Sequence, residues 1–297
     1  MTVRDFLSIV ELRTKVVSVS SCVLGFLAVR ADGHPFRPLP AAVLFVAALC
    51  VDMGTTAFNS YYDWLRGTDD RAHNREADKV LVHAGVSPGA AVGTAIVLFL
   101  AAAILGLVLV PLTGLWLLPF GFLCMAVGFL YSGGPLPISF TPIGEPVAGA
   151  FLGSALLYLA YAVASGGERG SALFAALPQG LFVAGILAAN NACDIEGDRA
   201  AGRRTLAVLV GPQIAPVVMA FYIASSFTAT ALLFATGRLG EPSLVAALAV
   251  AVAAALVTVI LLRAGRLGFS HERKSAVMKA VTLAFLFHTL ALGAALF

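Results

Sequence analysis

Long apolar runs alternate with short polar breaks along the whole chain. A helix needs about 20 residues to cross a hydrocarbon core of roughly 30 Å. Backbone polar groups in lipid must be paired within their own segment, and these runs are continuously apolar, so helices are predicted in preference to the alternating strands of a barrel. The pattern predicts an all-α integral membrane protein with about nine transmembrane helices. The runs are 14–31, 40–63, 89–111, 114–132, 144–165, 172–194, 214–236, 243–262 and 277–297.

The composition supports a membrane protein and argues against a soluble one. Hydrophobic residues make up 60% of the 297 and charged residues only 12%, whereas soluble domains carry roughly 25% charged residues. No linker or low-complexity segment divides the chain, so residues 1–297 are expected to form one transmembrane domain. The four cysteines show no metal-ligand spacing and are expected to be small buried hydrophobes. Asp5 and Glu11 argue against a transit peptide, and we expect the first helix to be retained.

The basic residues are divided unevenly between the two membrane faces. If the N-terminus is cytoplasmic and the chain crosses nine times, most Lys and Arg side chains fall on the inside, as the positive-inside rule requires. The outside loops hold Arg30, Arg37, Arg169 and Arg238. The inside segments hold Arg4, Arg13, Lys15, Arg66, Arg71, Arg75, Lys79, Arg199, Arg203, Arg204, Arg263, Arg266, Arg273, Lys274 and Lys279.

Two acidic stretches stand at the ends of the second and sixth runs, on the same predicted face. The first extends from Asn59 to Asp70 and the second from Asn190 to Arg199. Helical spacing places Asp52, Thr56, Asn59 and Asp63 on one side of one helix, and Asn190, Asp194 and Asp198 on one side of the other. Each helix therefore offers a column of oxygen ligands near its cytoplasmic end.

Facing columns of carboxylates would be costly without a cation, because like charges and desolvation both disfavour ionisation. Mg²⁺ prefers oxygen ligands and often binds through one or two carboxylates together with substrate phosphates. Arg66, Arg71 and Lys79 follow the first stretch, and Arg199 and Arg204 the second, where they offer charge-assisted hydrogen bonds to phosphate. The alternative is that the acids are solvated helix ends and the basic residues anchor the chain at the membrane. Carboxylates, magnesium and basic groups together favour a diphosphate ligand.

These residues resemble the UbiA superfamily of intramembrane aromatic prenyltransferases. Asn59, Asp63, Gly67 and Asp69 are similar to the first motif of its MenA type, the 1,4-dihydroxy-2-naphthoate polyprenyltransferases, and the stretch from Asn190 to Thr205 is similar to the second. The Tyr-Ser-Gly-Gly-Pro sequence from Tyr131, followed by Gly144 and Glu145, is a third likeness. The general superfamily pattern has an acid where Gly67 stands. Many relatives have Arg-Pro where this chain has Lys79-Val80, which leaves the phosphate-binding residue of that loop open.

The resemblance implies Mg²⁺-assisted transfer of a polyprenyl chain from an isoprenyl diphosphate to an aromatic acceptor, at the cytoplasmic face of a prokaryotic plasma membrane. It implies Asn59, Asp63, Asp194 and Asp198 as catalytic residues. Arg71, Lys79 and Arg204 would share the diphosphate charge, and Arg66 and Arg199 would also contact substrate. Tyr62 and Tyr131 would shield an allylic cation, with packing as the alternative for each. Glu145 would touch the acceptor, or stabilise the positive end of its helix. The implied Mg²⁺ ligands are Asn59, Asp63, Asp69, Asn190, Asp194 and Asp198.

Two alternatives remain from the sequence. A UbiA relative could use 4-hydroxybenzoate, homogentisate, haem or a chlorophyllide as acceptor, although Gly67 and the Tyr131 stretch favour naphthoate. A secondary transporter would also carry acids within membrane helices, but transporter sites usually lie near the bilayer midplane. Here the acids lie at helix ends beside arginines, which favours the enzyme. No basic stripe typical of nucleic-acid binding is present.

Overall fold

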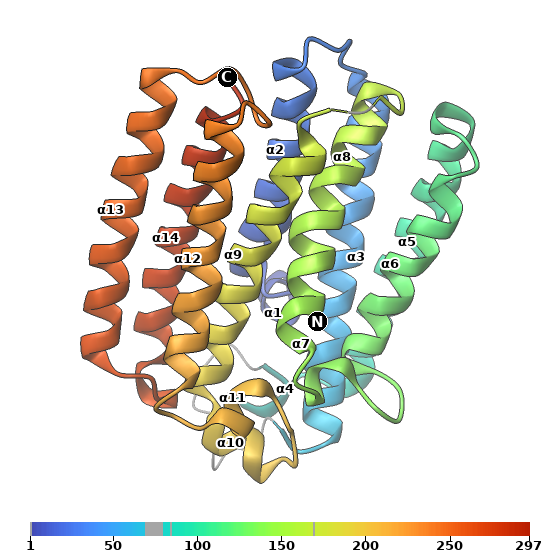
Figure 1. Ribbon diagram of the computed structural model, residues 1–297. Helices are drawn as coiled ribbons and strands as arrows, with labels where there is room; N and C mark the ends of the chain where they lie inside the picture. The colour runs from blue at the N-terminus through green and yellow to red at the C-terminus, as the bar shows by residue number, and fades with distance from the viewer. Residues whose placement is uncertain (1, 69–79, 84, 169) are drawn as a thin grey trace.

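A computed structural model describes residues 2–68, 80–83, 85–168 and 170–297, and every regular element in these residues is helical. The helices run alternately up and down in one bundle (Figure 1). The long helices are α2 (Val16–Ala31), α3 (Pro38–Leu65), α5 (Pro88–Thr113), α6 (Leu117–Ser132), α8 (Leu156–Ser165), α9 (Ala172–Cys193), α12 (Ala215–Ala235), α13 (Leu244–Leu267) and α14 (Lys274–Ala294). The short ones are α1 (Val3–Ile9), α4 (Val80–His83), α7 (Gly144–Ala148), α10 (Ile195–Ala200) and α11 (Leu206–Val210).

The helical spans match the apolar runs of the sequence. Eight helical stretches in the described residues are long and apolar enough to cross a membrane. The remaining run forms α6, whose 16 residues extend over about 24 Å at the rise of an α-helix. Each of the nine predicted runs is thus a helix, and the prediction of an all-α, multi-pass membrane protein is confirmed.

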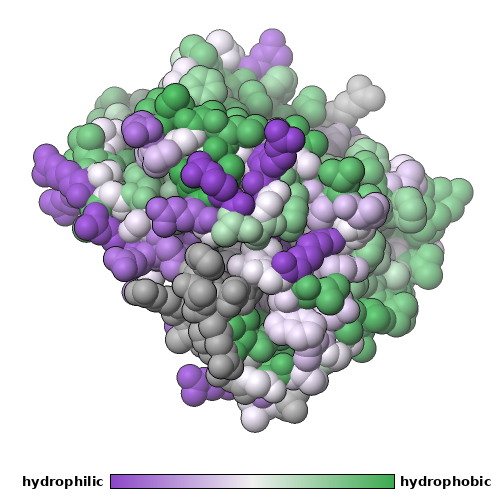
Figure 2. All heavy atoms as spheres, turned by 90° about the horizontal axis from the view of Figure 1, so that it is seen from below, coloured by the Kyte–Doolittle hydropathy of each residue, from purple (hydrophilic) through white to green (hydrophobic). Residues whose placement is uncertain are grey.

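The polar connections gather at one end of the bundle. Helices α3, α6, α9 and α13 end at the lower end of Figure 1, where α10 and α11 also lie. Figure 2 looks at this end and shows hydrophilic side chains gathered on it. Because both acidic stretches follow helices that end here, the alternation of the chain brings them to the same face.

Helix α9 is the most buried of the eight long spans, and glycines let a neighbour approach it closely. The span of α7 and α8 contains a π-helical turn, Gly149–Ala155, and Gly149 and Gly153 lie against Gly180 of α9. A Cβ atom on Gly153 would fall 2.6 Å from the Gly180 Cα atom. This contact fixes the position of α9 along the bundle axis, and with it the position of the second acidic stretch.

A buried ion pair joins α2 to α3 deeper in the bundle. Lys15 donates from Nζ to Asp52 Oδ1 at 2.6 Å and to Thr56 Oγ1 at 2.7 Å. Ser18 Oγ donates to the other oxygen of Asp52 at 2.5 Å. Asp52 therefore shares the helix face of Asn59 but has partners for both carboxylate oxygens, as a buried acid requires. His288, buried in α14, lies 2.8 Å from Ser226 Oγ through its Nε2 atom and belongs to the packing of the bundle.

Substitution of Gly153 by alanine tests the close approach to α9. We expect Gly153→Ala to lower the free energy of unfolding by about 1–3 kcal/mol, the usual effect of overpacking a tight core. Gly265→Ala in α13 is the matched control, because its new Cβ atom meets no other atom within 4 Å and alanine favours a helix. Thermal unfolding in detergent measures both. Equal midpoints for the two variants would contradict the proposed contact.

Candidate active site

One large cavity, of about 2590 Å³, is lined by residues of both acidic stretches. Asn59 and Asp63 reach it from α3, and Asn190 reaches it from α9. Asp194 and Asp198 line it from the connection that follows α9. The sequence-predicted ligands in the described part of the chain thus share one space, although α3 and α9 are separate helices.

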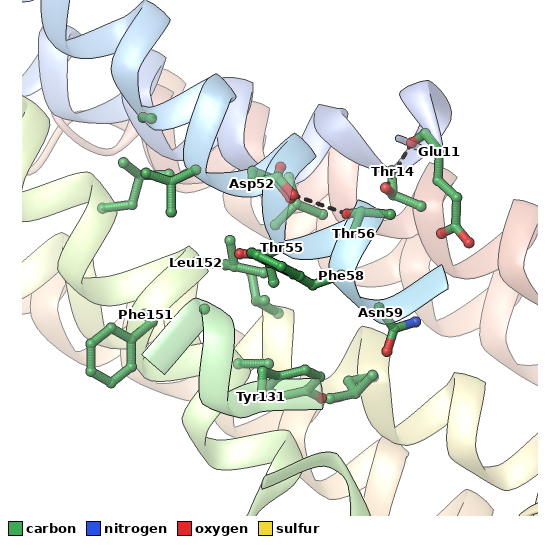
Figure 3. Close-up of a pocket in the computed structure, with 18 of the residues that line it drawn as sticks. Glu11, Thr14, Asp52, Thr55, Thr56, Phe58, Asn59, Tyr131, Phe151 and Leu152 are labelled. Carbon is green, nitrogen blue, oxygen red and sulfur yellow. Dashed lines mark hydrogen bonds between the residues drawn. The ribbon is translucent and has the colours of Figure 1, made fainter. Parts of the chain in front are cut away.

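Away from the carboxylates the walls of the cavity are largely apolar. They come from α3, α5 and α6 and from the span of α7 and α8. Figure 3 shows Thr55, Phe58 and Asn59 of α3 across from Tyr131 of α6, with Phe151 and Leu152 of the π-helical turn beside them. The cavity therefore joins an anionic end to a hydrophobic chamber within the membrane span.

Helical periodicity positions the first stretch. Asp52, Thr56, Asn59 and Asp63 all line the cavity, so the predicted column does occupy one face of α3. Ser132 Oγ, at the end of α6, donates to Asn59 Oδ1 at 2.7 Å. This bond orients the amide of Asn59 and ties the two helices together beside the site.

Arg203 connects the two acidic stretches. Its guanidinium donates to Asp63 Oδ1 at 2.5 Å and to Asp198 Oδ1 at 3.2 Å. A tight turn delivers it: Gly202 has a φ of 75°, and the Arg203 amide donates to the Asp198 carbonyl at 2.8 Å. The guanidinium also stands 4.9 Å from the centre of the Phe140 ring, which adds a cation–π contact.

Asp194 is held by the last helix of the bundle. Lys274 donates from Nζ to its Oδ2 atom at 2.6 Å, and His271 Nδ1 lies 3.0 Å from its Oδ1 atom. Both residues line the cavity. Sequence reasoning assigned neither of them to the site, because they lie 80 and 77 positions beyond Asp194 and carry no local motif.

The two carboxyls of the second stretch differ in acidity. Burial raises the pKa of Asp194, but the bonds from His271 and Lys274 outweigh burial and hold it below the usual value. Burial and, to a smaller degree, the charges of Asp194 and Asp63 raise the pKa of Asp198 to about 6 against the opposing effect of Arg203. Of these two carboxylates, Asp198 has the greater need of an additional cation.

Several predicted substrate contacts do not line the cavity. Arg66 donates to the backbone oxygens of Ser132 and Gly134, at 2.7 Å for the latter, and so ties the end of α3 to the end of α6. Tyr62 packs on that side, with its ring 4.9 Å from the Arg66 guanidinium. Arg199 and Arg204 are exposed.

Arg203, and not its neighbour Arg204, lines the cavity. The sequence predicted a basic residue after the second stretch. It did not determine which of two neighbouring arginines faces the cavity. The glycine at position 202 was the signal available in the sequence, because a glycine just past the end of a helix often redirects the chain.

Glu145 lies one layer behind the cavity. Only 1% of it is exposed, and its Oε1 atom accepts a hydrogen bond from Asn191 Nδ2 at 2.8 Å. Asn191 and Tyr131 line the cavity. Glu145 therefore orients the Asn191 side chain in the cavity wall.

Asp69, Arg71 and Lys79, three further predicted site residues, lie outside the described residues.

The oxygen atoms that line this part of the cavity are of the kind that Mg²⁺ prefers as ligands. Carboxylates and amide oxygens converge on one cavity, and Mg²⁺ prefers such ligands while retaining several waters. In the described ranges, no three His, Cys, Asp or Glu side chains converge tightly enough to hold an ion by themselves. Arg203 and Lys274 lie against the carboxylates, so cations of the chain neutralise the charges that Mg²⁺ would otherwise meet.

The chain is similar in sequence to proteins of one family. The model of the UbiA prenyltransferase family matches residues 18–295. A 1,4-dihydroxy-2-naphthoate octaprenyltransferase of Bacillus subtilis (strain 168) is 33% identical over 186 residues, which are 63% of this chain and 59% of that protein. The enzyme of that name from Mycobacterium tuberculosis is 34% identical over 173 residues, 58% of each chain. The matches thus span less than two thirds of these relatives' lengths.

Solved structures share the fold. A UbiA homolog from Archaeoglobus fulgidus bound to GPP and Mg²⁺ superimposes with a TM-score of 0.64 at 15% identity, covering 98% of this chain and 99% of the other. A digeranylgeranylglyceryl phosphate synthase gives 0.65 at 17% identity, covering 98% of each chain. The predicted resemblance to this family is confirmed. This chain belongs to the UbiA prenyltransferase family.

Proposed function

We propose that this protein transfers a polyprenyl chain from an isoprenyl diphosphate to an aromatic acceptor, with 1,4-dihydroxy-2-naphthoate as the favoured acceptor. One observation carries the proposal: carboxylates from two distant stretches line one end of a single cavity whose other walls are largely apolar. A prenyl diphosphate has the same division, with a charged diphosphate at one end and a hydrocarbon chain at the other.

The anionic end is assigned to the diphosphate. Asn59, Asp63, Asn190, Asp194 and Asp198 would hold Mg²⁺, together with Asp69. When bound, Mg²⁺ supplies positive charge to the leaving diphosphate oxygens. Departure of the diphosphate breaks the allylic C–O bond, and both bonding electrons leave with the oxygen.

Residues of the chain complete the charge balance around that step. Arg203 stands between Asp63 and Asp198. There it can donate hydrogen bonds to the diphosphate oxygens as negative charge develops on them. We assign this role to Arg203 in place of Arg204, with Arg71 and Lys79 as further candidates. Tyr131 lies across the cavity from Asn59 (Figure 3), where its ring can face the allylic cation.

The apolar chamber is assigned to the prenyl chain and the acceptor ring. The acceptor carbon attacks the allylic cation, and the ring then loses a proton or, for a ring carboxylate at the reacting position, CO₂. Asn191, held from behind by Glu145, forms a polar part of the cavity wall, and we place the acceptor's polar groups there. The relatives named as naphthoate octaprenyltransferases favour this acceptor over 4-hydroxybenzoate, homogentisate, haem or a chlorophyllide.

We further propose that residues 1–297 act as one domain, with the site at the cytoplasmic face of a prokaryotic plasma membrane. The excess of basic residues at the end of the bundle that carries the site supports this orientation. At that face the site can receive a water-soluble acceptor and a lipid-borne donor together.

Carboxylate substitutions test the assignment of the anionic end. We expect Asp63→Asn and Asp194→Asn to lower kcat by about 100-fold or more, because each removes charge that orients the leaving group. Glu196→Gln is the matched control, since Glu196 lies between Asp194 and Asp198 in sequence but is exposed outside the cavity. Prenyl transfer by purified enzyme is assayed with and without Mg²⁺. Full activity of both Asn variants would refute the site.

The acceptor is tested by following its carboxyl group. With carboxyl-labelled 1,4-dihydroxy-2-naphthoate and an isoprenyl diphosphate, we expect one labelled CO₂ for each prenylated product. Parallel assays use 4-hydroxybenzoate and homogentisate. Turnover of either of these with no turnover of naphthoate would show that naphthoate is not the acceptor and would assign the protein to another branch of the family.

The raised pKa of Asp198 predicts pH-dependent binding of Mg²⁺. A ligating carboxylate must be deprotonated, and with a pKa of about 6 the ionised fraction rises about tenfold between pH 5 and pH 7. We therefore expect Mg²⁺ affinity to rise by up to about tenfold over this range. Calorimetric titration in detergent measures it, and Asp198→Asn should flatten the dependence. The same slope in that variant would assign the proton to another group.

A further inference from the structure

We propose that Lys274, at the start of α14, is a diphosphate-binding residue that exchanges partners with the metal. Its ammonium neutralises Asp194 when no metal is bound and moves to the diphosphate oxygens when Mg²⁺ takes the carboxylate. The inference rests on the proposed function, since it concerns the same substrate. It adds the last helix of the bundle to a site that the sequence placed on two other helices.

The contacts at Asp194 carry the first step. Both of its carboxylate oxygens are engaged, Oδ2 by Lys274 Nζ at 2.6 Å and Oδ1 by His271 Nδ1 at 3.0 Å. Each oxygen keeps a second lone pair, but Mg²⁺ bound there would lie close to the Lys274 ammonium, and repulsion between the two cations favours opening of the Lys274 bond. The two cations, metal and ammonium, therefore compete for one carboxylate.

The burial of Lys274 strengthens its attraction to an anion in the cavity. Its side chain is 16% exposed, and charges so enclosed are only weakly screened. Lys274, Ser275 and His271 all line the cavity assigned to the diphosphate. Lysine combines a compact charge with a flexible four-carbon stem, so Nζ can turn from Asp194 to an anion in the cavity without movement of α14.

The orientation of α14 adds to this positive field. Lys274 and Ser275 are its first two residues and both line the cavity. The helix has 21 residues, and its N-terminal amide groups carry partial positive charge. Phosphate groups are stabilised at such helix ends. The backbone amide of Lys274 donates to the His271 carbonyl, so the helix contributes through its dipole and Lys274 through its ammonium.

The exchange predicts effects of opposite sign for one substitution. In Lys274→Gln a competitor for Asp194 is lost, so Mg²⁺ alone should bind about three- to tenfold more tightly. In the presence of saturating Mg²⁺ the same variant should bind inorganic pyrophosphate about tenfold more weakly, because a charge-assisted hydrogen bond is lost. A purely structural lysine would weaken both ligands or neither.

Calorimetric titration of the full-length protein in detergent measures both affinities, first with Mg²⁺ and then with inorganic pyrophosphate at saturating Mg²⁺. Lys274→Arg should retain pyrophosphate binding within about threefold. Arg266→Gln is the matched control, because it removes the same charge from an exposed position of α13 outside the cavity. Thermal unfolding of each variant verifies that it is folded.

The outcomes separate this inference from the proposed function. Pyrophosphate affinity of Lys274→Gln within twofold of the wild type would overturn the role of Lys274 and leave the prenyltransferase intact. Parallel weakening of Mg²⁺ and pyrophosphate binding would assign Lys274 a structural role instead. A wild-type protein that binds neither ligand would overturn the proposed function and this inference together.

Discussion

Charge neutralisation at the edge of the membrane interior is the constraint on which the site depends. Asp63, Asp194 and Asp198 line one cavity, and carboxylates brought so close must each find a positive partner. Arg203 joins Asp63 to Asp198, and Lys274 holds Asp194. These contacts link the ends of α3 and α14 to the segment around α10.

The scaffold around the site follows from the limits that lipid places on a polypeptide. Most of the bundle is held by apolar packing, and the closest approach is made where glycines remove side chains, as at Gly153 and Gly180. The buried pair of Lys15 and Asp52 fixes α2 against α3. Close packing around α9 and an ion pair on α3 thus hold the two acidic helices at fixed positions, which lets carboxylates of separate helices share one cavity.

The cavity also gives a physical reason for carrying out the proposed chemistry inside a membrane protein. Its polar end lies where α3 and α9 finish, and its apolar walls continue among α3, α5, α6 and the span of α7 and α8. A substrate with a charged head and a hydrocarbon tail can keep both ends in suitable surroundings. The apolar chamber would also keep water from a reactive allylic cation.

The sequence by itself determined the helices and the faces they present. Lipid requires each segment to pair its own backbone, so runs of apolar residues were sufficient to place every span, and the 3.6-residue period placed Asn59 and Asp63 on one side of α3. Tertiary structure alone decided which cations meet those acids. Gly202 turned Arg203 inward instead of Arg204, and the return of the chain after α13 brought Lys274 to Asp194 across 80 positions. Such pairings depend on how helices pack and on where a turn redirects the chain, and neither leaves a periodic mark in the sequence.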